Sequence, residues 1–194
     1  MSHPIDFCGE GSLDAVLARR LIAHVGGVCG HDYVDRAAPR GKQALDRRMR
    51  GFLIAARHGA RLLVLRDLDE DALCAGQLVE RLLPERHPRL CVRIVVRAAE
   101  AWLMADRQGI AAALRVPVSR VPAMPEAVPS PKARLVELAG HSSDAETRRI
   151  FAGGAQKRAA WVAEFIDERW DIRRAASVAP SLERALLRLR TLAA

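Results

Sequence analysis

Acidic residues follow three short, mostly apolar stretches of the sequence. They are Glu10 after residues 5–8, Asp67 and Asp69 after residues 62–65, and Glu100 after residues 90–96. If the three stretches are parallel strands, their carboxyl ends meet at one edge of a sheet, which is where open α/β folds place their sites. Gathered carboxylates raise one another's pKa unless a cation neutralises them, and all-oxygen donors suit Mg²⁺ or Mn²⁺. The pattern therefore indicates metal-assisted phosphodiester chemistry, in which the ion polarises a phosphoryl oxygen and helps activate water.

Simpler explanations exist for each acid taken alone. Asp14 and Asp71 each lie in an expected first helical turn, where the helix dipole favours a negative charge. An acid after a buried strand is also a common loop residue. The case depends on joint placement, and on Asp67 and Asp69 being two residues apart, because extended backbone would point both side chains to the same side.

Short β-like stretches alternate with longer helical stretches over the first hundred residues. The expected strands cover residues 5–8, 31–34, 62–65 and 90–96, and the expected helices begin with Ser12 as N-cap, at Gly41 and at Asp71. Strands that alternate with helices imply βαβ crossovers and hence parallel pairing. We therefore expect an α/β fold, with a Rossmann-like, parallel-centred sheet flanked by helices and a C-terminal helical extension.

The character of the sequence changes after Glu100. A helix is expected over residues 101–114, and five prolines then fall within residues 117–131. Proline cannot donate a backbone hydrogen bond, so this stretch is expected to be a linker or wrapped loop. The predicted organisation is an α/β domain over residues 1–115, the Pro-rich segment over 116–131, and a helical extension over 132–194 that packs on the α/β domain.

The chain is strongly basic, with a formal net charge of +8 and a sequence pI near 10.3. Such an excess favours a polyanionic partner, most simply nucleic acid. The densest basic segment is the expected helix over residues 41–57, whose first candidates for phosphate contacts are Arg47, Arg48, Arg50 and Arg57. Contacts of this kind would give affinity without reading sequence. An ordinary solvated face, or arginine enrichment by a GC-rich genome, would explain the same residues.

Nothing in the sequence points to a membrane or to secretion. The longest apolar runs are far shorter than the roughly 20 residues of a membrane span, and no signal sequence is visible at the N-terminus. Cys8, Cys29, Cys74 and Cys91 lack the close pairing of zinc sites. We expect these thiols to be small hydrophobes in the reducing environment of a cytoplasmic protein.

Three motifs together resemble a TOPRIM domain. They are Gly9-Glu10-Gly11-x-x-Asp14, Asp67-Leu68-Asp69, and Glu100-Ala101-Trp102-Leu103-Met104-Ala105-Asp106. More narrowly, they are similar to the small TOPRIM-like proteins found beside ATPases in bacterial defence loci, which are related to the nuclease half of OLD-type (overcoming lysogenization defect) proteins. The resemblance covers residues 4–106.

The resemblance implies a Mg²⁺- or Mn²⁺-dependent nuclease that cleaves DNA, working with an ATPase partner in antiphage defence. Its implied site has Glu10 as metal ligand or general base, Asp67 and Asp69 as metal ligands, Glu100 as ligand of a second ion, and Asp14 as a further ligand. A lysine from the helical region would stabilise the transition state. Lys157 is the first candidate for that lysine and Lys132 is the alternative.

Other functions are compatible with parts of the sequence. A catalytically weak subunit would hold DNA or a protein partner while its acids are vestigial. Asp67-Leu68-Asp69 could also be the nucleophile and acid of a haloacid-dehalogenase-type phosphatase, but that motif normally follows the first strand. A dinucleotide site at Gly9-x-Gly11 is the weakest alternative, because Asp14 occupies the place of the third glycine.

Overall fold

The computed structural model describes residues 3–33 and 41–194, and the chain divides into two compact units. The first unit is Met1–Val95 together with Glu183–Ala194, and the second is Val96–Leu182. The second unit therefore begins at Val96, earlier than the domain boundary that the sequence predicts after residue 115. The physical reason is that the last strand ends at Val95 and that the end of the chain belongs to the first unit.

The first unit contains a parallel sheet with the strand order β2-β1-β3-β4. Its strands are β1 (Ile5–Cys8), β2 (Cys29–Asp32), β3 (Arg61–Asp67) and β4 (Leu90–Val95). The predicted α/β class with a parallel sheet is thus confirmed. β2 begins two residues earlier than expected, and Val34 lies outside the described residues.

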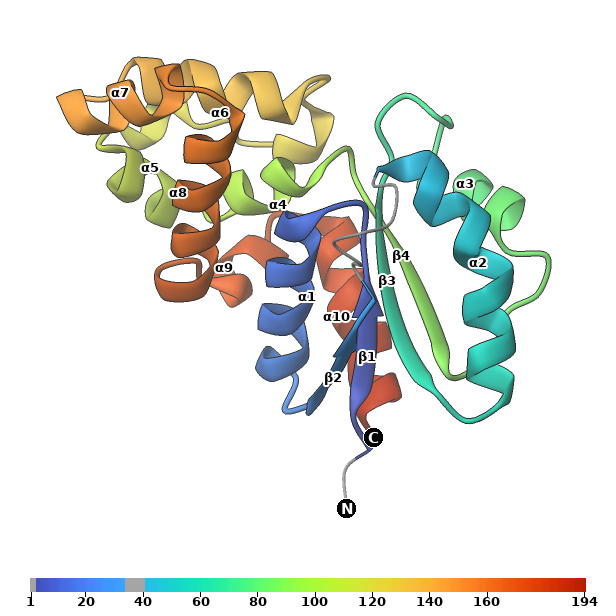
Figure 1. Cartoon of the computed structure of the whole chain (residues 1–194). Coiled ribbons are helices and arrows are strands. Elements are labelled where there is room, and N and C mark those ends of the chain that lie inside the picture. The colour runs from blue at the N-terminus through green and yellow to red at the C-terminus, as the bar shows by residue number, and fades with distance from the viewer. Residues whose placement is uncertain (1–2, 34–40) are drawn as a thin grey trace. The chain divides into compact units, whose positions relative to one another are not determined.

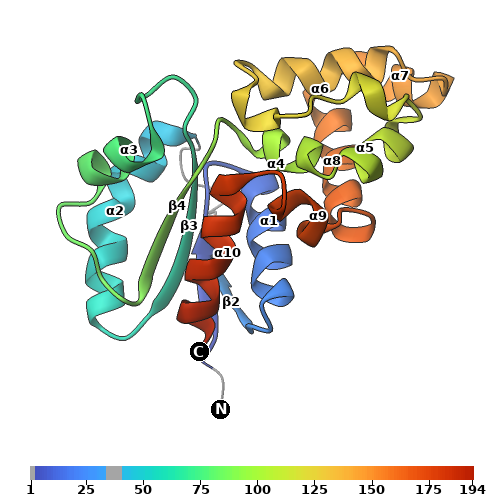
Figure 2. The ribbon, with the colours of Figure 1, turned by 180° about the vertical axis from the view of Figure 1, so that it is seen from behind.

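Helices cover both sides of this sheet. They are α1 (Ser12–His24), α2 (Lys42–Arg57), α3 (Ala75–Leu82) and the first unit's part of α10 (Pro180–Ala193). β3 and β4 run between α1 and α10 on one side and α2 and α3 on the other (Figures 1 and 2). Right-handed crossovers produce this division. The connection through α1 leads from β1 toward the β2 edge of the sheet, whereas the connections through α2 and α3 lead toward the β4 edge, so α1 lies on the opposite face from α2 and α3. β3 is accordingly aliphatic and buried along Leu62–Leu65.

Two predicted helix starts are wrong, both because an aspartate makes a more favourable contact. The helix expected from Asp71 begins only at Ala75, and Asp71 lies in the preceding loop, where Arg66 and Lys42 bind its carboxylate. The N-cap of α1 is Gly11 rather than Ser12, since the Asp14 side chain accepts hydrogen bonds from the backbone there.

The second unit is helical throughout the residues assigned to secondary structure. Its helices are α4 (Ala99–Ala105), α5 (Arg107–Leu114), η1 (Val118–Arg120), η2 (Pro125–Ala127), α6 (Pro131–Gly140), α7 (Ala145–Ala152), α8 (Ala155–Glu168) and α9 (Ile172–Ala176). The single helix expected over residues 101–114 is two helices, because the buried Asp106 caps α5 by accepting the amide hydrogen of Gly109. The Pro-rich segment contains the short helices η1 and η2.

None of the helices within residues 3–33 and 41–194 is long and apolar enough to cross a membrane.

Candidate functional site

The turn after β1 holds two of the predicted site residues through its glycine pattern. A Cβ atom on Gly9 would lie 2.2 Å from the Cβ of Asp14, so only glycine lets the Asp14 side chain pack against this backbone. The Oδ2 atom of Asp14 accepts hydrogen bonds from the backbone amides of Glu10 (2.8 Å) and Gly11 (3.0 Å). The Gly-Glu-Gly-x-x-Asp motif is therefore a helix-capping turn that buries Asp14.

Glu10 reaches from this turn to the end of the neighbouring strand β3. Its Oε1 atom accepts a hydrogen bond from the backbone amide of Asp67, with a length of 2.9 Å. The contact follows from the topology, because β1 and β3 are adjacent and parallel and both end at the same edge of the sheet. The structure thus brings Glu10, Asp14 and Asp67 together from distant parts of the sequence.

Asp69 is placed differently from what its spacing predicts. β3 ends at Asp67, and Asp69 has a φ of 46°, so the backbone between the two residues is not extended. The reason given for both side chains facing the same side is therefore wrong. The Oδ2 atom of Asp69 lies 3.4 Å from the Nζ atom of Lys42 on α2.

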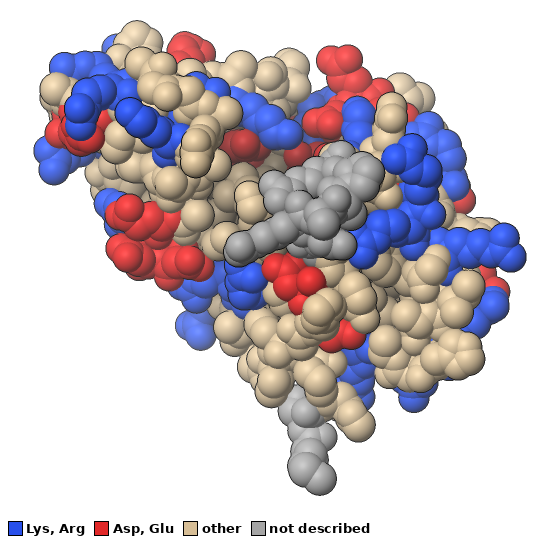
Figure 3. Space-filling model, viewed as in Figure 1, with Lys and Arg blue, Asp and Glu red and all other residues tan. Residues whose placement is uncertain are grey.

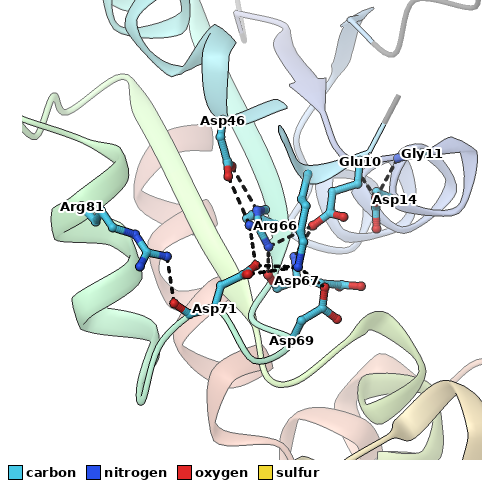
Figure 4. A network of polar contacts seen from close by, with 10 residues as sticks. Glu10, Gly11, Asp14, Asp46, Arg66, Asp67, Asp69, Asp71 and Arg81 are labelled. Atoms are coloured by element: carbon cyan, nitrogen blue, oxygen red, sulfur yellow. Dashed lines mark hydrogen bonds and ion pairs between the residues drawn. The ribbon is translucent and has the colours of Figure 1, made fainter. Parts of the chain in front are cut away.

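A buried arginine that the sequence reasoning did not identify lies at the centre of the acids. The Arg66 side chain is only 2% exposed, and its guanidinium contacts Asp46 (3.0 Å), Asp71 (2.7 Å) and Glu10 (3.4 Å) (Figure 4). Because side chains alternate along a strand, Arg66 faces α2 while Asp67 faces the other side of β3. The signal was present in the sequence as an arginine that interrupts the aliphatic run before Asp67.

The acids around Arg66 differ in the direction in which their pKa values are shifted. We call the acids together the acid cluster, which consists of Glu10, Asp14, Asp46, Asp67, Asp69 and Asp71. Burial raises the pKa of Asp71, but hydrogen bonds from Arg66 and Lys42 outweigh it and hold that pKa below its usual value. Arg66 and Lys42 contact four of the six carboxylates, those of Glu10, Asp46, Asp69 and Asp71.

The raised-pKa side of the cluster contains Asp14 and Glu10, beside Asp67. Burial, followed by the charge of Asp67, raises the pKa of Asp14 to about 7, and its two backbone hydrogen bonds offset only part of this rise. Burial and the charge of Asp67 likewise raise the pKa of Glu10. Burial, together with the neighbouring carboxylates, therefore keeps the proton of Asp14 bound at a pH where an isolated carboxylic acid is ionised.

A hard divalent cation would suit this side by charge and by donor type. Carboxylate oxygens are the ligands that Mg²⁺ and Mn²⁺ prefer, and Glu10, Asp14 and Asp67 could provide them. In the part of the chain that the structure describes, no three Asp, Glu, His or Cys side chains lie close enough together to hold a metal ion as they stand. Binding would therefore require these side chains to turn toward a shared point.

Three other predicted site residues belong to the second unit. Glu100 lies in the first turn of α4, and Lys157 is an exposed residue of α8. Lys132, the alternative lysine, is exposed near the start of α6. Their roles stay predictions, whereas the four acids Glu10, Asp14, Asp67 and Asp69 all lie in the first unit.

The basic helix α2 has two kinds of arginine. Arg48 donates a 2.8 Å hydrogen bond to the carbonyl of Tyr33 and lies over the ring of Phe52, and Arg57 pairs with Glu85. Arg47 and Arg50 are exposed and make no ion pair with any residue that the structure describes. Figure 3 shows basic side chains gathered on the surface over α2. Arg47 and Arg50 are therefore the members of the predicted set that are available to a phosphate backbone.

Comparisons of the chain with family models, with curated proteins and with solved structures found no match. The resemblance to TOPRIM domains rests on the motifs of the sequence.

Proposed function

We propose that this chain is a metal-dependent nuclease of the TOPRIM type, which cleaves phosphodiester bonds in nucleic acid. The observation that carries the proposal is the raised-pKa side of the acid cluster, where Asp14 has a pKa of about 7 beside Glu10 and Asp67. Buried, mutually repelling carboxylates at the carboxyl edge of a parallel sheet are costly to stability, and such cost is typical of functional sites.

The side chains have distinct proposed roles. Asp14, Asp67 and Asp69 would hold Mg²⁺ or Mn²⁺, and Glu10 would be a further ligand or would accept the proton of the attacking water. A raised pKa suits Glu10 to the second role, because a general base works best when its pKa approaches the pH of the reaction. When bound, the divalent ion would supply polarisation of a phosphoryl oxygen and a more acidic water.

Other parts of the proposal have different support. Glu100 as ligand of a second ion and Lys157 as the group that stabilises the transition state rest on the sequence resemblance. So do DNA as substrate, an ATPase partner and a role in antiphage defence. The exposed Arg47 and Arg50 on α2 support contacts to a phosphate backbone.

The test is a nicking assay on supercoiled plasmid with Mg²⁺ or Mn²⁺, compared with EDTA. We expect metal-dependent nicking that Asp67→Asn abolishes and that Asp167→Asn, an exposed aspartate of α8, leaves unchanged. Calorimetric titration with Mn²⁺ gives a readout independent of activity, and we expect Asp67→Asn to weaken the binding. Cleavage that survives Asp67→Asn, or wild-type protein that binds no Mn²⁺, would contradict the proposal.

One observation favours a second candidate function, a catalytically weak TOPRIM-like subunit that binds DNA or a protein partner. Arg66 already neutralises part of the acid cluster through Glu10, Asp46 and Asp71, and no three metal donors converge in the described residues. This alternative predicts no nicking under any metal condition. It also predicts salt-dependent DNA binding that Arg47→Gln with Arg50→Gln weakens and Asp67→Asn does not.

A further inference from the structure

A pocket of about 660 Å³ lies along β4, away from the acid cluster. β4 is an edge strand of the sheet and runs between α3 and α10 (Figure 2). The pocket is lined by residues of α3, of the turn after it, of β4 and of α10, all from the first unit. None of these lining residues belongs to the acid cluster, so the pocket is a separate site.

Four arginines line this pocket, and no aspartate or glutamate is among its lining residues. The arginines are Arg86 in the turn, Arg93 on β4, and Arg184 and Arg188 on α10. Within the described parts of the chain none of the four forms an ion pair, and their one side-chain hydrogen bond is from Arg188 to the carbonyl oxygen of Pro88. We call the cavity that these four arginines line the arginine pocket. No carboxylate of the described residues pairs with the positive charge of this pocket.

Arg93 experiences this charge most strongly. Its Nε atom is buried and has no hydrogen-bond partner in the described residues. Burial holds the pKa of Arg93 below its usual value, and the charges of Arg184, Arg188 and Arg86 lower it further. A buried donor without an acceptor, surrounded by like charges, is unfavourable unless an acceptor comes from outside the chain.

Protection of an open sheet edge does not account for the arrangement. A single charged side chain on the edge strand is enough to discourage pairing with another strand. Here three further arginines come from the turn and from α10, and Arg184 and Arg188 are four residues apart, where like charges on a helix repel. Convergence from three elements points to a shared ligand.

We propose that the arginine pocket binds the phosphate groups of a small phosphorylated molecule. Guanidinium groups match phosphate geometry through paired hydrogen bonds, and several arginines suit a ligand with two or more negative charges. The apolar side chains of Val79, Leu83 and Val92 also line the pocket and provide a wall for the organic part of the ligand. The volume lies within the range of about 300–1,000 Å³ that is typical of small-molecule sites.

The test is calorimetric titration of the full chain with inorganic pyrophosphate in EDTA at low ionic strength. We expect binding that Arg93→Gln and Arg188→Gln each weaken about tenfold or more, since each removes a charge-assisted hydrogen bond. Arg190→Gln is the matched control, because Arg190 is an exposed arginine of the same helix outside the pocket. Circular dichroism of each variant checks folding. Absence of binding, or an equal loss in Arg190→Gln, would overturn the proposal.

Two further arms separate the possible ligands. An oligonucleotide or a glutamate-rich peptide that binds through Arg93, when pyrophosphate does not, would overturn the small-ligand proposal in favour of a macromolecule. For the organic part, adenosine triphosphate should slow alkylation of the exposed Cys74, which lines the pocket, and should leave the exposed Cys29 outside it unaffected. Equal reactivity of Cys74 with and without the nucleotide would refute occupation of the apolar wall. Because EDTA excludes metal, these results are independent of nuclease activity.

Discussion

Arg66 and Arg93 lie on neighbouring strands of one sheet, where their electrostatic surroundings are opposite. Arg66 pairs in register with Ile94, the residue after Arg93. Three carboxylates surround Arg66 and raise its pKa, whereas burial and three arginines lower the pKa of Arg93. The comparison shows that the described part of the chain supplies counterions to Arg66 and none to the partly buried Arg93, whose acceptor we propose is a ligand. Arg66 is therefore expected to hold the fold together and Arg93 to weaken it in the absence of ligand.

The largest expected change in stability comes from removing Arg66. Arg66→Met should lower the free energy of unfolding by about 3–5 kcal/mol, because it leaves the partly buried Asp46, Asp71 and Glu10 without their shared cation. Urea denaturation at pH 7 measures the change. Adding Asp46→Asn to Arg66→Met should recover part of the loss, since it removes one of the unpaired charges. A loss below about 1 kcal/mol would show that Arg66 does not stabilise the acid cluster.

The second effect tests the raised-pKa side of the cluster through the pH dependence of stability. The pKa of Asp14 rises from 3.8 in the unfolded chain to about 7, so the folded protein retains a proton that the unfolded chain has released. Folding stability from this proton is complete below pH 3.8 and is lost as the pH rises through 7. We expect a decrease of about 2.5 kcal/mol in the free energy of unfolding between pH 5 and pH 8 in EDTA.

Asp14→Asn is the control for this pH dependence. The amide oxygen can still accept the two backbone hydrogen bonds of the capping turn, but the side chain no longer ionises. The difference in unfolding free energy between wild type and variant, measured by urea denaturation at several pH values, isolates the contribution of Asp14. A difference that does not change between pH 5 and pH 8 would mean that Asp14 ionises normally.

The third substitution is expected to stabilise the protein. Arg93→Met should raise the free energy of unfolding by about 1 kcal/mol in phosphate-free buffer, because it replaces a desolvated, repelled cation by an apolar side chain of similar length. Arg190→Met, at an exposed position of α10, should change stability by less than about 0.5 kcal/mol. Destabilisation by Arg93→Met would indicate that Arg93 makes a favourable contact within the chain, and the contrast with Arg66 would fail.

Patterns along the chain were enough to predict the parallel sheet and the approach of Glu10 to Asp67 at its edge. Alternating apolar stretches specified parallel strands, and parallel strands place Glu10 next to Asp67 whatever the details of packing. The helix start at Asp71 could not be read correctly, because local preference favours an acid in a first turn. Only the folded chain shows that Arg66 and Lys42 hold this carboxylate instead.

Both arginine sites depend on contacts between distant segments. In the sequence, Arg66 is only an arginine that interrupts an aliphatic strand. Its ion pair with Asp46, which lies 20 residues earlier, forms only when α2 packs on β3. In the arginine pocket, Arg188 contacts Pro88 across 100 residues. Composition reported the excess of positive charge but could not say which arginines converge. Topology rules cover strand ends, and side-chain pairs between a helix and a strand depend on packing that those rules leave open.

The smallest effect comes from an arginine that is paired and exposed. The side chains of Arg57 and Glu85 are 51% and 53% exposed and lie 2.5 Å apart, so water screens their attraction and ordering them opposes the gain. Arg57→Gln should therefore lower the free energy of unfolding by at most about 1 kcal/mol, and by less in high salt, as urea denaturation at two salt concentrations would measure. A loss as large as that of Arg66→Met would mean that pairing alone determines the contribution of an arginine. If the loss at Arg57 is small, burial explains why removing Arg66 lowers the free energy of unfolding so much. The charge of the neighbouring residues then explains why removing Arg93 raises it.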